Sequence, residues 1–157
     1  MYPPVQLYLI RPGETAWSLS GKHGCWPARA CARTICTLAG LDADAPIETD
    51  LAEWDYGEFE GLSTAETARM HPHSDAWADD CVGGEMPTDI SMRADRLIAW
   101  LLRLSGNLAL FSHGQFARAL AARWIGFPVR EGRHFAVDTV TIGILSFETV
   151  RLKRRII

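Results

Sequence analysis

Apolar residues repeat along the chain in two distinct ways, as short unbroken runs and at helical spacing. Residues 5–10 and 108–111 are short runs that are apolar on both faces, as expected for buried strands of a parallel sheet. Residues 28–38, and a segment that follows Thr88 and runs to Leu104, carry apolar positions three and four residues apart, which predicts amphipathic helices. Thr88 is the predicted N-cap of the second. A glycine follows each of these segments, as is common where helices end. The pattern therefore predicts strands that alternate with helices.

Capping and turn residues add further elements to this pattern. Ser63-Thr64-Ala65-Glu66 is a capping-box sequence that begins a helix ending near His71-Pro72. Residues 115–125 form another predicted helix, which Gly126 ends. Residues 140–147 and 150–157 are β-prone stretches, joined closely enough to predict a hairpin. Strands that alternate with helices and finish in a hairpin indicate an α/β sandwich with a mostly parallel sheet.

The size and charge of the chain limit what it can do. With 157 residues, of which 48% are hydrophobic, the chain can bury one core but not two of typical size. Residues 1–157 are therefore expected to form a single domain. The net charge of -3 provides no field that would attract nucleic acid or an anionic membrane. We expect neither partner, so any anion site must be local.

The sequence carries no signal for a membrane span, for secretion or for a metal site. Its N-terminus lacks a basic region followed by an apolar stretch, and no apolar run approaches the roughly 20 residues that span a bilayer. A cytoplasmic location is therefore expected. The four cysteines form no C-x-x-C pair, and His71-Pro72-His73 matches no standard ligand spacing. We expect no metal and no disulfide framework.

Chemically useful side chains follow both predicted buried strands. Arg11-Pro12-Gly13-Glu14-Thr15 comes after the first run, and Ser112-His113-Gly114 comes after the second. In open α/β sheets, ligands bind beyond the carboxyl ends of the strands. The planar guanidinium group of Arg11 fits phosphate oxygens, and a turn that leads into a helix adds backbone N–H donors. The two strand ends are therefore candidates for a phosphate site.

Two segments between these strands add acidic groups. Residues 51–61 form an acidic, aromatic loop that contains Glu53, and Gly84-Glu85 precedes the longest predicted helix. The aromatic residues of the loop fit either the protein core or the wall of a pocket, and the sequence leaves both open. These residues are Trp54, Tyr56 and Phe59.

In this order, the four motifs resemble those of the histidine phosphatase superfamily, which includes phosphoglycerate mutase. Its members carry Arg-His-Gly-Glu-Thr after the first strand, then a glutamate-bearing loop, a Gly-Glu-Ser element that reads Gly84-Glu85-Met86 here, and a second histidine. The resemblance implies a three-layer α/β sandwich that hydrolyses phosphomonoesters of small molecules through a phosphohistidine, with no cofactor. It further implies that Arg11 and His113 bind the phosphate and that Glu53 protonates the leaving oxygen.

The sequence departs from the family pattern at the nucleophile. Pro12 stands where the family has its nucleophilic histidine, and a proline ring has no atom that can attack phosphorus. In another hydrolase, removal of the nucleophile lowers turnover by on the order of 10⁶. We therefore expect the phosphatase activity to be impaired or lost.

A second departure concerns the segment after the first motif. Compared with the family pattern, roughly 30 residues are absent near residues 25–30, about the size of one strand-helix unit. The family's second phosphate-binding arginine falls on Ala30, with Arg29 and Arg33 on either side. We predict that Arg29 takes that role. The sheet is expected to lack one strand, which would expose pairing edges or apolar surface.

These features lead to one leading hypothesis for function and two alternatives. The leading hypothesis is a histidine-phosphatase-like protein whose action on a phosphorylated small molecule is impaired or lost. The first alternative is a non-catalytic module that binds a phosphorylated ligand through Arg11 and His113. The second is the remnant of a disrupted gene. The sequence does not specify the substrate or the oligomeric state.

Overall fold

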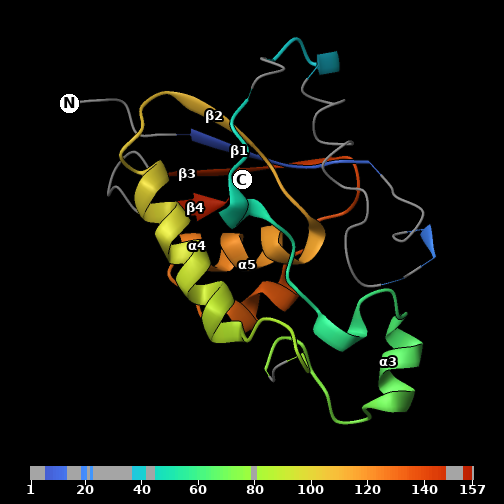
Figure 1. Ribbon diagram of the computed structural model, residues 1–157. Coiled ribbons are helices and arrows are strands. Elements are labelled where there is room, and N and C mark those ends of the chain that lie inside the picture. The colour runs from blue at the N-terminus through green and yellow to red at the C-terminus, as the bar shows by residue number, and fades with distance from the viewer. Residues whose placement is uncertain are drawn as a thin grey trace.

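The computed structural model describes residues 6–13, 19–20, 22, 37–41, 45–78, 81–147 and 154–156. Within these ranges a four-stranded sheet has the order β2-β1-β3-β4 (Figure 1). Its strands are β1 (Gln6–Arg11), β2 (Asn107–Phe111), β3 (Thr141–Phe147) and β4 (Arg154–Ile156). The two apolar runs of the sequence are thus strands β1 and β2, as predicted.

The described strands pair in both directions. Strand β1 is parallel to β2, with Ile10 opposite Phe111, and antiparallel to β3, with Arg11 opposite Thr141. Strands β3 and β4 are antiparallel, which confirms the predicted hairpin. The α/β class is confirmed, and the pairing among the described strands is mixed, because the hairpin of β3 and β4 adds two antiparallel pairings to the parallel one. The interior place of β1 agrees with its apolar character on both faces.

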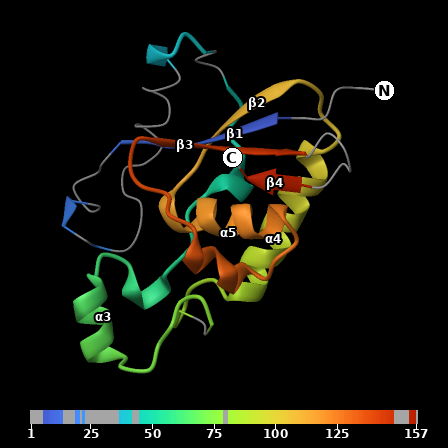
Figure 2. The same cartoon turned by 180° about the vertical axis from the view of Figure 1, so that it is seen from behind.

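Two helices pack together beside this sheet. Helix α4 (Pro87–Leu101) and helix α5 (Gly114–Trp124) contact each other, and α5 also contacts β1 and β4. Figures 1 and 2 show α5 lying below the strands in both views, with α4 against it. The buried face of α5 includes Phe116, Leu120 and Trp124, each fully buried. Burial of such large side chains is the main stabilising contribution to this layer.

A third helix, α3 (Thr64–Met70), lies apart from the sheet (Figures 1 and 2). Its capping box forms as predicted: the Glu66 backbone N–H donates to Ser63 Oγ, and the Ser63 backbone N–H donates to Glu66 Oε2. Both bonds satisfy N–H groups that have no partner within the helix. The first turn of α3 is therefore fixed by local sequence.

Helix α4 begins earlier than the sequence pattern predicted. Its N-cap is Met86, not Thr88, and Pro87 is the first helical residue. Proline suits this position because its missing N–H would have no partner there anyway. The Asp89 carboxylate accepts the Met86 backbone N–H at 3.0 Å, which completes the first turn. Asp89 thus supplies the bond from the third helical position back to the N-cap, and Thr88 lies inside the first turn of the helix.

Several predictions concern residues outside the described ranges. The helix predicted over residues 28–38 lies there, except for residues 37 and 38, which are helical. Arg29, Arg33 and the shortened segment near residues 25–30 also lie outside the described part of the chain. In the described ranges, no helix has the length and apolar composition needed to cross a membrane.

The acidic, aromatic loop of residues 51–61 is folded into the core. Two short 3-10 helices shape it, Thr49–Leu51 and Gly57–Phe59. All three of its aromatic side chains are buried in the core cluster, where Trp54 also meets the ring of Trp77 edge-on at 5.6 Å. The choice left open by the sequence is therefore settled in favour of core packing for Trp54, Tyr56 and Phe59.

Candidate functional site

The carboxyl ends of β1 and β2 bring the first and last sequence motifs together. The parallel pairing sets Ile10 opposite Phe111, and the backbone N–H of Ser112 continues it by donating to the Ile10 carbonyl at 3.0 Å. The Ser112 hydroxyl donates to the Leu51 carbonyl at 3.0 Å, which ties this strand end to the acid-bearing loop. Arg11, His113 and Glu53 consequently belong to three adjoining segments.

Arg11 lies against the first turn of α5. Its guanidinium group donates to the Val137 carbonyl. A Cβ built on Gly114 would lie 3.0 Å from Arg11 Cζ, which is closer than side chains normally approach. The glycine at position 114 therefore leaves the space that the Arg11 side chain needs. A larger residue at the end of the motif Ser112-His113-Gly114 would crowd Arg11.

The Glu53 carboxylate occupies the N-terminal end of α5. Oε1 accepts the backbone N–H of Phe116 at 2.7 Å and that of Trp54 at 3.0 Å, and Oε2 accepts the backbone N–H of Gln115 at 3.1 Å. The first N–H groups of a helix have no partner inside the helix and carry partial positive charge. Glu53 supplies that partner from a distant part of the sequence.

His113 is the N-cap residue of α5 and is half-buried between charged groups. Burial lowers the pKa of its imidazole below the ordinary value of 6.5. The Glu53 carboxylate raises that pKa, and the Arg11 and Arg93 guanidinium groups lower it further. Because burial and two cations oppose a single anion, the net direction is downward. A neutral imidazole at pH 7 is the consequence.

Pro12 occupies a buried position directly after Arg11. Its carbonyl accepts the Val140 backbone N–H at 3.4 Å. Val140 has a φ of 58°, a left-handed conformation that β-branched residues rarely adopt. The turn that contains Val140 therefore packs on Pro12 with a backbone conformation that is costly for valine. At this strand end the chain presents a saturated ring instead of a nucleophilic side chain.

The Gly84-Glu85 motif packs directly on the acid-bearing loop. The Glu85 backbone N–H donates to the Asp55 carbonyl at 2.9 Å, and the Trp54 indole N–H donates to the Glu85 carbonyl at 2.9 Å. Glycine is required on both sides of this contact. A Cβ on Gly84 would lie 2.4 Å from the Asp55 carbonyl oxygen, and one on Gly57 would lie 2.2 Å from that of Val82. The two segments thus act as one unit that carries Glu53.

Sequence reasoning missed Arg93, which joins this unit to α4. The residue is only 8% exposed, and its guanidinium group donates to the carbonyls of Asp50, Ala52 and Glu53 at 2.7–3.3 Å. It also forms a 2.8 Å ion pair with Glu85. A signal was present in the sequence, because Arg93 lies three residues after Ile90 and four before Leu97, on the apolar face of the helix. Charged residues are rarely buried without a partner.

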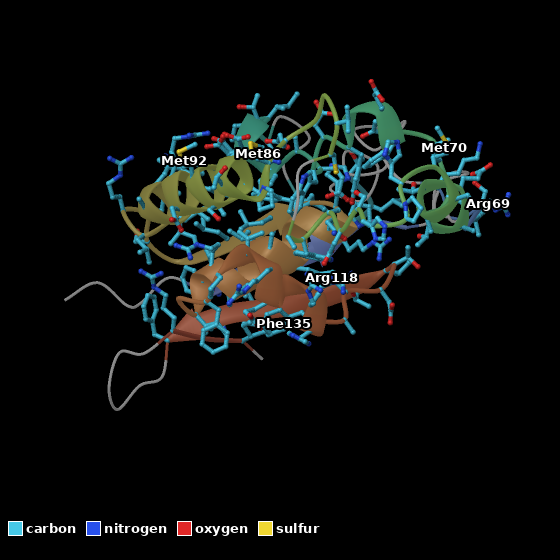
Figure 3. The ribbon with its side chains drawn as sticks, turned by 90° about the horizontal axis from the view of Figure 1, so that it is seen from below. Arg69, Met70, Met86, Met92, Arg118 and Phe135 are labelled. Atoms are coloured by element: carbon cyan, nitrogen blue, oxygen red, sulfur yellow. The ribbon has the colours of Figure 1, made fainter. Side chains whose placement is uncertain are left out.

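Arg118 is a further cation beside the site. It donates to the carbonyls of Gly132 and Arg133 in the 3-10 helix η3 (Val129–His134), and its guanidinium lies 5.3 Å from the ring centroid of Trp77. Burial lowers the pKa of Arg118, and the nearby Arg11 adds to this effect. Figure 3 shows Arg118 and Phe135 on one side of the molecule, with Met86 and Met92 toward the other. Arg118 thus holds η3 close to Arg11 and Glu53.

The structure does not test every predicted site residue. Arg29 lies outside the described residues, so its place relative to Arg11 is not described. Among the residues that are described, no group of three histidine, cysteine, aspartate or glutamate side chains is arranged to hold a metal ion. Arg11, Glu53 and His113 are brought together, and Pro12 adjoins them.

Comparison with known proteins identifies the family. The model of the histidine phosphatase superfamily (branch 1) matches residues 25–154. An acid phosphatase of Mycobacterium tuberculosis is 36% identical, in an alignment that covers 91% of this chain and 87% of that protein. The chain belongs to the histidine phosphatase superfamily. The family match includes Glu53, Gly84-Glu85 and His113, whereas Arg11 and Pro12 precede it.

Solved structures show the same histidine phosphatase fold. The protein of open reading frame Rv3214 of Mycobacterium tuberculosis superposes with a TM-score of 0.82 at 31% identity, covering 97% of this chain and 95% of that one. A protein of Escherichia coli described as a putative alpha-ribazole-5'-P phosphatase superposes with a TM-score of 0.72 at 21% identity, covering 98% and 95%. The phosphoglycerate mutase-like α/β sandwich is therefore confirmed.

The alignment with the acid phosphatase bears on the predicted deletion in this member of the superfamily. It extends over 180 positions although it covers 91% of this 157-residue chain, or about 143 residues, which leaves about 37 positions without a residue of this chain. That number is close to the predicted loss of roughly 30 residues, about one strand-helix unit. The comparison supports the size of the deletion but does not locate it.

The pH dependence of stability provides a test of the His113 environment in this superfamily member. Because the folded state holds the pKa of His113 below 6.5, the unfolded state binds more protons at pH values just below 6.5. Stability therefore rises with pH through the window from the folded pKa up to 6.5, and this contribution of His113 is lost as the pH falls through that window. Urea unfolding across this window should show a steeper loss of stability in the wild type than in His113→Asn.

The exposed His73 offers a matched control for this measurement. His73→Asn should retain the wild-type dependence of unfolding free energy on pH. If His113→Asn instead shows the same dependence as the wild type, burial of a neutral His113 is contradicted.

Proposed function

We propose that this chain is a histidine phosphatase homologue that binds a phosphorylated small molecule but is impaired in hydrolysing it. The ligand's phosphate would lie beyond the carboxyl ends of β1 and β2. The observation that carries this proposal is the convergence of Arg11, Glu53 and His113 at the end of the strand that the buried Pro12 follows. The family of the chain and the phosphatase activity named for its acid phosphatase relative support the class of ligand.

The retained groups suit the recognition of a phosphate. Arg11 carries donors in a planar fork that matches phosphate oxygens. His113 can donate one hydrogen bond as a neutral imidazole, or two once a bound dianion raises its pKa. Glu53 would protonate the leaving oxygen in an active relative of this chain. The chain therefore keeps one phosphate-binding arginine, the second histidine and the acid of the family pattern.

The impairment follows from chemistry at position 12. Transfer of phosphate to a histidine requires a ring nitrogen with a free lone pair, which then bonds to phosphorus as the ester oxygen leaves with a proton. The ring nitrogen of Pro12 is an amide nitrogen without that lone pair or a hydrogen. No phosphoenzyme can form at this residue. The wild-type protein should hydrolyse an aryl phosphate no faster than its His113→Ala variant.

Binding can be measured separately from turnover. Inorganic phosphate should raise the melting temperature of the wild-type protein in a concentration-dependent manner, because a ligand that binds only the folded state stabilises it. Arg11→Met should remove most of this increase. Phosphate also stabilises proteins nonspecifically by exclusion from their surface. Chloride at equal ionic strength and the Arg130→Met variant, which changes an exposed arginine, are therefore the controls.

The outcome distinguishes the remaining hypotheses. An increase that Arg11→Met removes and Arg130→Met leaves supports a phosphate-binding site. An increase equal in all three proteins would contradict such a site. A chain that shows no cooperative unfolding at all would support the hypothesis of a remnant of a disrupted gene.

A further inference from the structure

We propose that Arg93 is a positioning residue that sets the Glu53 carboxylate on the N-terminal end of α5. This inference deepens the proposed function, because it concerns the acid of the same site. The hydrogen bonds of Arg93 are directed at main-chain carbonyls of residues 50–53 and at the Glu85 carboxylate. Its effect would pass through the backbone of residues 50–53.

The donors of Arg93 are directed at main-chain atoms of the segment that leads into Glu53. Nη1 donates to the carbonyls of Asp50 at 3.0 Å and Ala52 at 2.7 Å, and Nη2 donates to that of Glu53 at 3.3 Å. Three bonds from one rigid, planar group fix the orientation of successive peptide units. The backbone at Glu53 is therefore held from the side of α4.

Two further contacts of Arg93 connect the same segment to its surroundings. Nη2 forms the 2.8 Å ion pair with Glu85, whose carboxylate also accepts the Asp55 backbone N–H at 2.9 Å. Arg93 Cζ lies 4.2 Å from the ring centroid of Phe116, in the first turn of α5. Phe116 is also the residue whose N–H donates to Glu53 at 2.7 Å. Arg93 thus contacts both Glu53 and the first turn of α5, whose backbone N–H groups donate to the Glu53 carboxylate.

The burial of Arg93 raises the energetic cost of leaving its hydrogen-bond donors without partners. The residue is 8% exposed, and its Nε has no hydrogen-bond partner among the described residues. A buried guanidinium with one unsatisfied donor is costly. The other donors offset part of that cost by bonding to three carbonyls and to the Glu85 carboxylate. A residue that served only to fill the core could be apolar at lower cost.

A double-mutant cycle separates positioning from simple packing or direct charge. The Glu53 carboxylate raises the pKa of His113, so Glu53→Gln should lower that pKa, as followed by NMR titration of the imidazole. If Arg93 holds Glu53 in place, the same Glu53→Gln change made in Arg93→Gln should shift the pKa by about half as much or less. The direct effect of the Arg93 charge cancels, because the two proteins compared in each pair have the same residue at position 93.

The amide protons of α5 provide a second readout. Those of Gln115 and Phe116 donate to Glu53, so in Arg93→Gln they should exchange with solvent roughly tenfold faster or more. Arg96→Gln is the matched control. Arg96 is one turn further along α4 and binds the Asp50 side chain at 2.6 Å, but it has no bond to Glu53. Arg96→Gln should leave both the exchange rates and the pKa coupling unchanged.

Arg93→Lys extends the test if Arg93→Gln does not fold. Lysine keeps the charge but cannot reach three carbonyls with a planar fork, so it should reduce the coupling between Glu53 and His113 partially. Full wild-type coupling in a folded Arg93→Gln or Arg93→Lys variant would overturn the proposal. None of these measurements requires phosphate binding or turnover, so the proposal can fail while the proposed function holds, and the reverse.

Discussion

Pro12→His is expected to raise the rate of aryl phosphate hydrolysis by at least about a hundredfold over the wild-type protein. The substitution restores a ring nitrogen next to Arg11, with His113 and Glu53 already in adjoining segments. A nucleophile is worth on the order of 10⁶ in turnover where the rest of a site is intact. The gain should remain below that value, because the resemblance predicts Ala30 at the position of the family's second phosphate-binding arginine. Initial rates on a generic aryl phosphate measure the effect.

The double variant Pro12→His/His113→Ala is the control for this gain. It should return to the wild-type background, since His113 would help neutralise the charge on the transferring phosphoryl group. Trapping of a phosphohistidine in Pro12→His would show directly that position 12 is the nucleophile. A folded Pro12→His protein that remains at background would mean that turnover also requires the segment whose loss is predicted near residues 25–30.

Gly57→Ala is expected to lower the free energy of unfolding by at least about 3 kcal/mol. A Cβ at this position would lie 2.2 Å from the Val82 carbonyl oxygen and 2.4 Å from the Gly84 backbone nitrogen. Backbone atoms cannot move aside as a flexible side chain can, so the two loops must separate, which adds to the cost of overpacking. The φ of Gly57, 54°, adds a cost of about 1–2 kcal/mol for a residue with a Cβ. Urea unfolding measures the sum.

Gly83→Ala isolates the contribution of backbone conformation. Gly83 has a φ of 72° in the same loop, but a Cβ there would meet nothing within 4 Å. Its substitution should cost only about 1–2 kcal/mol. If the two variants are equally destabilised, close packing of the loops is not what makes Gly57 necessary.

The elements that the sequence predicted well are those determined by local chemistry. The apolar runs at β1 and β2 and the capping box of Ser63 and Glu66 depend on residues within a few positions of one another. The start of α4 was predicted incorrectly, because Thr88 was weighed as an N-cap without the bond from Met86 to Asp89. Capping is decided by geometry that residue type alone does not fix.

The pairing of strands was less accessible from the sequence. A run of apolar residues marks a buried strand but does not give the direction of its neighbours. The place of β3 beside β1, with Arg11 opposite Thr141, depends on how the last third of the chain returns to the first. Such long-range pairing has no local signature, so the mixed character of the sheet became visible only in the structure.

The candidate site was predicted residue by residue through the family motifs, but its contacts were not. Arg11, Glu53 and His113 were expected near one another, and the structure places them in adjoining segments. That Glu53 caps α5 could not be predicted, because its partners are 62 and 63 positions away. Arg93 was overlooked for a different reason: the helix pattern was read for its apolar residues only.

The contacts of Arg93 have a consequence for how positions 50 and 52 can change over time. Arg93 binds the main-chain oxygens of these residues, and every amino acid has such an oxygen. Substitutions at Ala52 that keep the backbone conformation would therefore leave the link to Glu53 intact. Among relatives of this chain, Arg93 could stay constant while position 52 varies freely, so a search for paired substitutions would not detect their contact.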